Sequence, residues 1–122
     1  MDGGACLAAL KTAEKIKNDY YRAGTLTAIA GAQAVAGDGV AARTTINLAL
    51  ATAEKINADY YHPVALTSIA EAQAKMGDVA GAQATAEKIK DAYHRARALT
   101  AIGRIQERLC VVRTIGTDSG VI

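Results

Sequence analysis

The pentapeptide TAEKI occurs three times in this 122-residue chain, as Thr12–Ile16, Thr52–Ile56 and Thr85–Ile89. Five consecutive residues do not recur three times by chance in so short a chain, so the sequence contains an internal repeat. The first two copies begin 40 residues apart, whereas the last two begin 33 residues apart. The nature of this repeat, and the seven residues by which it shortens, decide the fold.

The similarity continues on the C-terminal side of each copy. When the isoleucines of the three copies are aligned, residues of the same type coincide at five further positions. They are Tyr20, Tyr60 and Tyr93; Leu26, Leu66 and Leu99; Thr27, Thr67 and Thr100; Ile29, Ile69 and Ile102; and Gln33, Gln73 and Gln106. Repeat lengths of about 33 to 47 residues are typical of proteins built from stacked helical hairpins.

Composition and spacing predict that every element is a helix. Alanine, the strongest helix former, is the most abundant residue, and Pro63 is the single proline. A Gly-Asp pair divides each unit, so that Gly37 or Gly77 closes one helix and Asp38 or Asp78 caps the next. We therefore predict an all-α protein with about six helices, at residues 4–20, 23–36, 40–60, 63–76, 79–93 and 95–114.

The change in repeat length fits this interpretation. Seven residues are close to two turns of α-helix, so their removal shortens a helix by about 10 Å and rotates its far end by only about 20°. A buried stripe of apolar residues survives such a deletion. We therefore place the missing residues in the fifth helix, which we expect to be shorter than the third.

The repeat resembles the tetratricopeptide repeat, as a divergent member of that superfamily. The resemblance is carried by Leu26, Ile29–Ala30, Gln33, Gly37–Asp38, Ala42, Ile46 and Ala49 in one unit, by Leu66, Ile69–Ala70, Gln73, Gly77–Asp78, Ala82 and Ala86 in the next, and by Leu99, Ile102–Gly103 and Gln106 in the third. Glutamine replaces the bulky aromatic residue that the family usually has, and the proline that commonly closes a unit is missing. The resemblance implies a right-handed α-solenoid of stacked antiparallel hairpins, forming one domain over residues 1–122. Its parts would be a half repeat at 4–20, repeats at 23–60 and 63–93, a terminal helix at 95–114 and a tail at 115–122.

The resemblance also implies where a partner would bind. In tetratricopeptide arrays the first helix of each hairpin lines the concave face, and the corresponding residues here are Thr27, Val35, Thr67, Glu71, Lys75, Arg97, Thr100, Arg104 and Arg108. The arginines belong to a basic stretch, residues 95–113, which contains five arginines and one glutamate. We expect a non-catalytic scaffold for protein–protein interaction that binds a peptide or protein on the concave face. An acidic or carboxylate-bearing peptide would suit the last helix, because arginine pairs well with carboxylates, although a solvated helix face is the simpler interpretation of these arginines.

Two other functions stay open. The chain begins on the second helix of a hairpin and ends on a first helix, whose apolar stripe continues through Leu109 and Val112. Terminal repeats of monomeric solenoids present polar outer faces, so the first alternative is self-assembly as a two-fold homodimer through this last helix. The second alternative, RNA binding in the manner of pentatricopeptide repeats, ranks well below because no base-reading positions or basic groove are evident.

The sequence shows no sign of catalysis or of a bound metal or cofactor. It contains no motif of a known nucleophile, zinc site or phosphate-binding loop. His62 and His94 fall in corresponding turns between repeats, and we interpret both as turn residues; we interpret Cys6 and Cys110 as buried free thiols. No segment is long and apolar enough for a membrane span, and the first 20 residues lack the order of a signal peptide, so we expect a cytoplasmic protein.

Two further sets of repeat-equivalent residues are predicted to lie inside the protein. The first set would be buried amides that each bond to a backbone carbonyl, namely Gln33, Gln73 and Gln106. The second set would be small residues at the closest approach of neighbouring helices, namely Ala30, Ala70 and Gly103.

Overall fold

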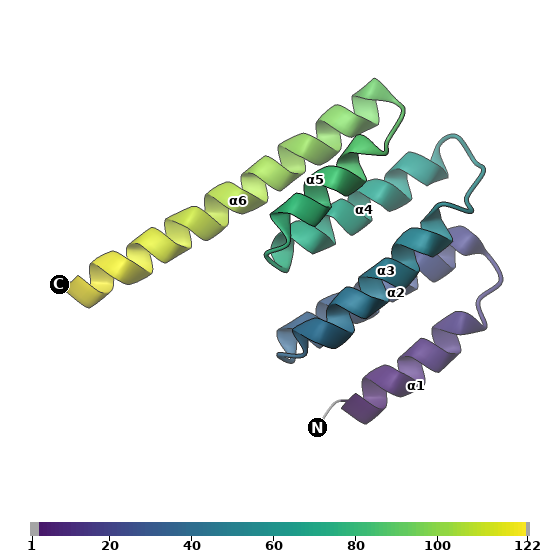
Figure 1. Cartoon of the computed structure of the whole chain (residues 1–122), viewed down its shortest axis with the longest axis horizontal. Coiled ribbons are helices and arrows are strands. Elements are labelled where there is room, and N and C mark those ends of the chain that lie inside the picture. The colour runs from purple at the N-terminus through teal and green to yellow at the C-terminus, as the bar shows by residue number, and fades with distance from the viewer. Residues whose placement is uncertain (1–2, 122) are drawn as a thin grey trace.

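The computed structural model describes the backbone of residues 3–121 and the side chains of residues 6–108. The predicted all-α fold is confirmed, because these residues form six helices and no strand (Figure 1). The helices are α1 (Gly3–Glu14), α2 (Asp19–Val35), α3 (Gly39–Ala53), α4 (Tyr61–Lys75), α5 (Val79–Glu87) and α6 (Ala92–Val121). Among these described helices, none combines the length and the apolar character that crossing a lipid bilayer requires.

Each helix packs against the next one along the chain. In addition, α4 packs against both α2 and α6, so that α2, α4 and α6 lie next to one another in that order. No described helix contacts one that is more than two positions away in the chain. The protein is therefore a row of helices, which Figure 1 shows from α1 at one end to α6 at the other.

The predicted turns at the two Gly-Asp pairs are confirmed. Gly37 and Gly77 have φ angles of 91° and 88°, in the left-handed region that residues with a side chain rarely adopt. The carboxylates of Asp38 and Asp78 each accept a hydrogen bond from the backbone N–H three residues later, at 3.1 and 2.9 Å. Each pair therefore ends one helix and starts the next.

The predicted ends of three helices are wrong, because the helices that contain TAEKI end inside this motif. Helices α1, α3 and α5 end at Glu14, Ala53 and Glu87. We expected them to continue to the tyrosines, which instead lie at the starts of α2, α4 and α6.

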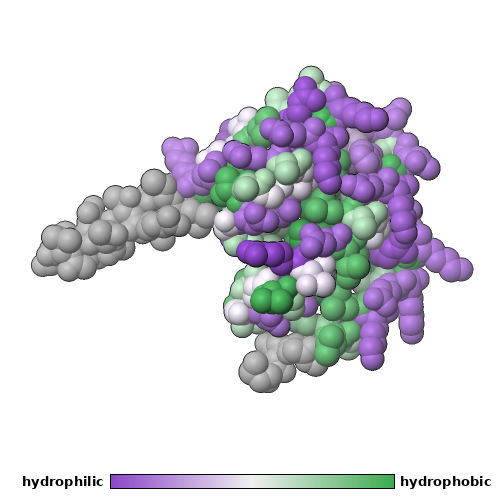
Figure 2. Space-filling view, viewed as in Figure 1, coloured by the Kyte–Doolittle hydropathy of each residue, from purple (hydrophilic) through white to green (hydrophobic). Residues whose placement is uncertain are grey.

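A repeated hydrogen bond follows each of these early helix ends. The carbonyl oxygen of the isoleucine in each TAEKI is bonded by a side chain six residues later, in the first turn of the following helix. The bonds join Arg22 Nη1 to Ile16 O at 2.9 Å, His62 Nδ1 to Ile56 O at 3.1 Å, and Arg95 Nη1 to Ile89 O at 3.0 Å. Each bond therefore ties the loop after one helix to the first turn of the next. Figure 2 shows hydrophilic side chains along the side of the molecule that carries these loops, where Lys15, Lys17, Lys55, Lys88 and Lys90 are exposed.

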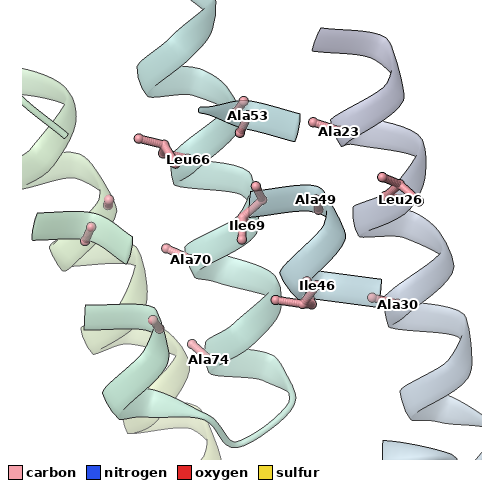
Figure 3. Packing of buried hydrophobic residues seen from close by; sticks show 14 of the residues in the cluster. Ala23, Leu26, Ala30, Ile46, Ala49, Ala53, Leu66, Ile69, Ala70 and Ala74 are labelled. Carbon is pink, nitrogen blue, oxygen red and sulfur yellow. The ribbon is translucent and has the colours of Figure 1, made fainter. Parts of the chain in front are cut away.

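Alanine residues lie where the helices approach one another. Ala30, Ala49 and Ala70 have no exposed surface, and Figure 3 shows Ala49 of α3 between α2 and α4. The prediction that Ala30 and Ala70 lie inside the protein is thus confirmed. The same prediction is wrong for Gly103, which is exposed because no described helix packs on that side of α6.

The change in repeat length lies in the helix where we placed it. α3 has 15 residues, whereas α5 has 9. Thr45 and Thr85 stand at the same distance from the aspartate that caps their helix, and Thr52 and Thr85 both begin TAEKI. Thr85 of α5 therefore corresponds to two threonines of α3. It matches Thr45 by its distance from the helix cap and Thr52 by its place in TAEKI, and these two residues are two helical turns apart.

The buried glutamines have partners that we did not predict. Gln33 and Gln73 are each only 5% exposed, as expected. Their Oε1 atoms accept hydrogen bonds of 2.6 Å from the hydroxyls of Thr45 and Thr85, whereas we expected backbone carbonyls as partners. Gln106 of α6 is exposed, so its predicted burial is wrong for the same reason as that of Gly103.

Helix α6 is longer than predicted. It continues to Val121, through residues that we assigned to a tail, because Cys110 and Val111 stand where a Gly-Asp pair follows α2 and α4. The side chains of Leu109 and Val112, which we predicted to mediate self-association, lie outside the described residues, as does that of Cys110. Cys6 is a free thiol and is partly exposed, so its predicted burial is wrong.

Candidate functional site

The nine predicted partner-binding residues belong to α2, α4 and α6, and the packing of these helices places eight of them around two hollows. The first hollow, of about 410 Å³, lies between α2 and α4 and is lined by Thr27, Gly31, Ala34, Val35, Ser68, Glu71, Ala72, Lys75 and Met76. The second, of about 400 Å³, lies between α4 and α6 and is lined by Thr67, Glu71, Tyr93, Ala96, Arg97, Thr100, Ala101 and Arg104. We call the surface of α2, α4 and α6 that carries these two hollows the three-helix face.

Glu71 of α4 joins the two hollows, because it lines both of them. The ninth predicted residue, Arg108, lines neither hollow and is exposed one helical turn beyond Arg104. The structure therefore brings most of the predicted residues onto one continuous surface and leaves Arg108 at its border.

Charge is unevenly distributed on the three-helix face. The α2 side offers mostly small or uncharged residues, whereas α6 carries Arg97 and Arg104, which are both exposed. Within the described residues, neither arginine forms an ion pair. The guanidinium carbon of Arg97 lies 5.8 Å from the ring centre of Tyr93, a cation–π arrangement that leaves N–H donors available for an anion.

Two of the three threonines of the face use their hydroxyl hydrogens within their own helices. Thr27 donates to the carbonyl of Ala23, and Thr67 donates to the carbonyl of Pro63, both at 2.8 Å. Each hydroxyl oxygen keeps lone pairs, so it can accept a further hydrogen bond but cannot donate one. These two positions therefore suit N–H groups of a ligand.

A row of aromatic side chains borders the three-helix face, and we did not predict it. The row contains all five tyrosines of the chain and one histidine, in the order Tyr21, Tyr20, Tyr61, Tyr60, His94 and Tyr93. Neighbouring ring centres are between 4.7 and 6.1 Å apart. The contact of Tyr20 with Tyr61 joins the starts of α2 and α4, and that of Tyr60 with His94 joins the starts of α4 and α6.

The sequence contained a signal for this row. Tyr20–Tyr21, Tyr60–Tyr61 and Tyr93–His94 are aromatic pairs at the same position of the repeat. We aligned only the first member of each pair and placed it at the end of a helix. Because the pairs instead open α2, α4 and α6, which lie side by side, their rings meet.

His62 and His94 are not equivalent residues of the repeat. His62 is the second residue after Tyr60, whereas His94 is the first residue after Tyr93. His62 bonds the carbonyl of Ile56, as described above, whereas His94 hydrogen-bonds and pairs with the carboxylate of Asp91. The pKa of the Asp91 carboxyl is lower than its usual value, mainly because of the hydrogen bond from His94. Both histidines lie in the first turn of a helix, and among the described side chains no three His, Cys, Asp or Glu residues gather as a metal site requires.

No protein-family model, curated protein or solved structure matches this chain. A function therefore has to be inferred from the repeat and the surface of this protein. Both point to the three-helix face, where residues of three successive units line two neighbouring hollows.

Proposed function

We propose that this chain is a helical-repeat scaffold of the tetratricopeptide kind, a right-handed solenoid that binds an acidic segment of a partner protein on the three-helix face. The packing order supports the repeat. Helices α2, α4 and α6 contact one another in succession, while α3 and α5 each contact only the described helices that flank them in the chain. In stacked hairpins, one helix of each hairpin takes such an inner position and the other lies outside.

The observation that carries the proposal is the junction of the two hollows at Glu71. Two hollows with a common wall residue lie next to each other, and together they define a path across α2, α4 and α6. An extended segment that follows this path contacts residues of three units at once. Several small contacts of this kind add up to specific recognition of a peptide.

The charges along the path predict the chemistry of the partner. Arg97 and Arg104 offer planar groups of N–H donors that match a carboxylate. Gly31 and Ala34, on the α2 side, leave room for a peptide backbone to approach closely. Glu71 lies between these regions, and it would repel a carboxylate but accept from an N–H group. The partner segment therefore places acidic side chains, or a C-terminal carboxylate, towards α6.

Selection from a random-peptide library on the parent protein tests this proposal. We expect the selected peptides to be rich in Asp, Glu or free C-terminal carboxylates. Their affinity should fall as salt is added, because the arginines that bind them are exposed. Arg104→Glu should weaken binding about tenfold or more, which corresponds to about 1.4 kcal/mol.

Arg43→Glu is the matched control, since Arg43 is an exposed arginine of α3 and lines neither hollow. It changes the net charge by the same amount and should leave the affinity unchanged. Selected peptides without acidic groups, or equal effects of the two substitutions, would place the partner on another surface.

A further inference from the structure

Three residues of α6 are exposed although their counterparts in α4 are buried. They are Leu99, Gly103 and Gln106, and the counterparts are Leu66, Ala70 and Gln73. Leu99 is 40% exposed, whereas Leu66 is 1% exposed. In α4 this side is covered by α5, but no described helix covers it in α6.

Three residues of α1 show the same difference. They are Ala9, Thr12 and Ile16, and their counterparts in α5 are Ala82, Thr85 and Ile89. The three residues of α5 are buried, whereas Thr12 is exposed and the other two residues of α1 are partly exposed. Helix α5 packs between α4 and α6, but α1 contacts only α2 among the described helices.

The two uncovered sides match each other. The hydroxyl of Thr85 in α5 donates a hydrogen bond of 2.6 Å to Oε1 of Gln73 in α4. Helix α1 carries the same threonine at the start of TAEKI, and α6 carries the same glutamine after its leucine and isoleucine. Within one molecule the two sides cannot meet, because α1 and α6 lie at opposite ends of the row of helices (Figure 1).

We propose that α1 of one molecule packs on α6 of a second molecule, in the register in which α5 packs on α4. Thr12 then lies opposite Gln106 and donates to its Oε1, in exchange for its bond to the carbonyl of Ala8. Gly103 lies at the closest approach, where α4 has Ala70. The pair leaves one free α1 and one free α6 at its ends, so the contact is head-to-tail and can be repeated by further molecules. This contact does not depend on peptide binding at the three-helix face.

Such a contact differs from the two-fold homodimer that we predicted through the last helix. In a two-fold dimer α6 meets α6, α1 takes no part, and association stops at two molecules. In a head-to-tail contact each molecule uses α1 once and α6 once. Substitutions that block only one of the two helices therefore distinguish the two arrangements.

Two arginine substitutions block one side each. Gly103→Arg obstructs the side of α6, and Thr12→Arg obstructs the side of α1. We expect neither substitution to disturb the isolated molecule, because a Cβ at Gly103 meets no atom within 4 Å and Thr12 is exposed. Circular dichroism checks that both variants keep the helix content of the parent.

Sedimentation velocity at micromolar to millimolar concentrations measures the result. We expect the parent to form species larger than a dimer as its concentration rises, and each variant alone to sediment as a monomer. An equimolar mixture of the two variants should form a 1:1 dimer that does not grow, because one variant supplies the free α1 and the other the free α6.

Three further variants serve as controls that should associate like the parent. Gly24→Arg and Thr44→Arg place the same side chain at an exposed glycine of α2 and an exposed threonine of α3. Gly103→Ala gives α6 an alanine at the position where α4 has the buried Ala70. A parent that stays monomeric, a Thr12→Arg variant that associates like the parent, or a mixture that stays monomeric would each overturn the proposal.

Discussion

Each hairpin contains one buried hydrogen bond between side chains of its two helices. It runs from Thr45 of α3 to Gln33 of α2 in the first hairpin, and from Thr85 of α5 to Gln73 of α4 in the second. Because both glutamines are buried, water cannot replace the threonine hydroxyl. An amide oxygen left without a donor in such a place costs about 1–3 kcal/mol.

Thr85→Val tests the value of this bond. The substitution keeps the shape of the side chain but removes the donor, so we expect the free energy of unfolding to fall by about 1–3 kcal/mol. Urea unfolding followed by circular dichroism measures the loss. Thr44→Val is the control, since Thr44 is exposed and bonds only to its own helix, and it should change stability by less than about 0.5 kcal/mol. Equal losses in both variants would show that helix propensity, and not the bond to Gln73, is responsible.

The Asp91–His94 contact gives the start of α6 a dependence on pH. Since the His94 hydrogen bond lowers the folded-state pKa of Asp91, this contact stabilises the protein above the ordinary aspartate pKa of about 3.9. Its contribution is lost as the pH falls through the lower folded-state value. Titration of the Asp91 carboxyl by NMR should show a midpoint below about 3.9 that rises in His94→Ala. His62→Ala should leave it unchanged, and identical midpoints in all three proteins would mean that the bond is absent in solution.

At the scale of the helix, the sequence could predict which segments are helical but not where those with TAEKI end. Gly37 and Asp38 act within a few residues of themselves, so the turn that they form can be recognised from the sequence. No Gly-Asp pair follows the ends at Glu14, Ala53 and Glu87, and the bonds found there join the isoleucine carbonyls to side chains of the next helix, which meet only in the folded protein. Arg22 and His62 form equivalent bonds to these carbonyls although they are different residue types. Residue identity alone therefore did not reveal the repeated bond.

Equivalent positions of α4 and α6 should respond in opposite ways to the same substitution. Ala70 has no exposed surface, so Ala70→Leu should overpack the contact of α4 with its neighbours and cost about 1–3 kcal/mol. A side chain at Gly103 points into open space in the isolated molecule, and Gly103→Leu should gain up to about 1 kcal/mol from helix propensity. Thermal unfolding at low protein concentration measures both. A loss of stability in Gly103→Leu would mean that this side of α6 is covered within one molecule.

At the scale of the whole molecule, the sequence could predict which residues share one surface, because the repeat gives them equivalent positions on successive helices. Eight of the nine predicted residues line the two hollows. The aromatic row escaped prediction because its contacts join different helices, and those contacts depend on helix boundaries that we had misplaced. We also failed to predict that Gly103 and Gln106 are exposed. Alignment of the repeats shows which residues are equivalent, but it does not show whether a neighbouring helix covers them.

The repeat should tolerate the removal of seven residues, close to two helical turns, better than a shorter deletion that rotates the rest of the helix. Deletion of residues 46–52 joins Thr45 directly to Ala53 and gives α3 the length that α5 has from its cap to TAEKI. Thr45 keeps its distance from Asp38, so its bond to Gln33 is retained. We expect a cooperative, helical protein of reduced stability, because the buried surface of Ile46 and Ala49 is lost. Circular dichroism and urea unfolding measure both properties.

Deletion of residues 46–50 is the control for this prediction. It removes fewer residues but rotates the remainder of α3 by about 140°, which turns Ala53 and Ile56 away from the core. We expect this shorter deletion to abolish cooperative unfolding. If both deletions behaved alike, the phase of the helix would not be what limits the length of the repeat.

The order of packing also determines how the protein would carry a mechanical load. Every packed pair of described helices is separated by at most one other helix in the chain. A force that pulls α1 away from α6 therefore passes in series through contacts between neighbours, and no described contact bridges the two ends to bear the load. Under tension we therefore expect the protein to yield at contacts between neighbouring helices, because each repeat contacts only its neighbours.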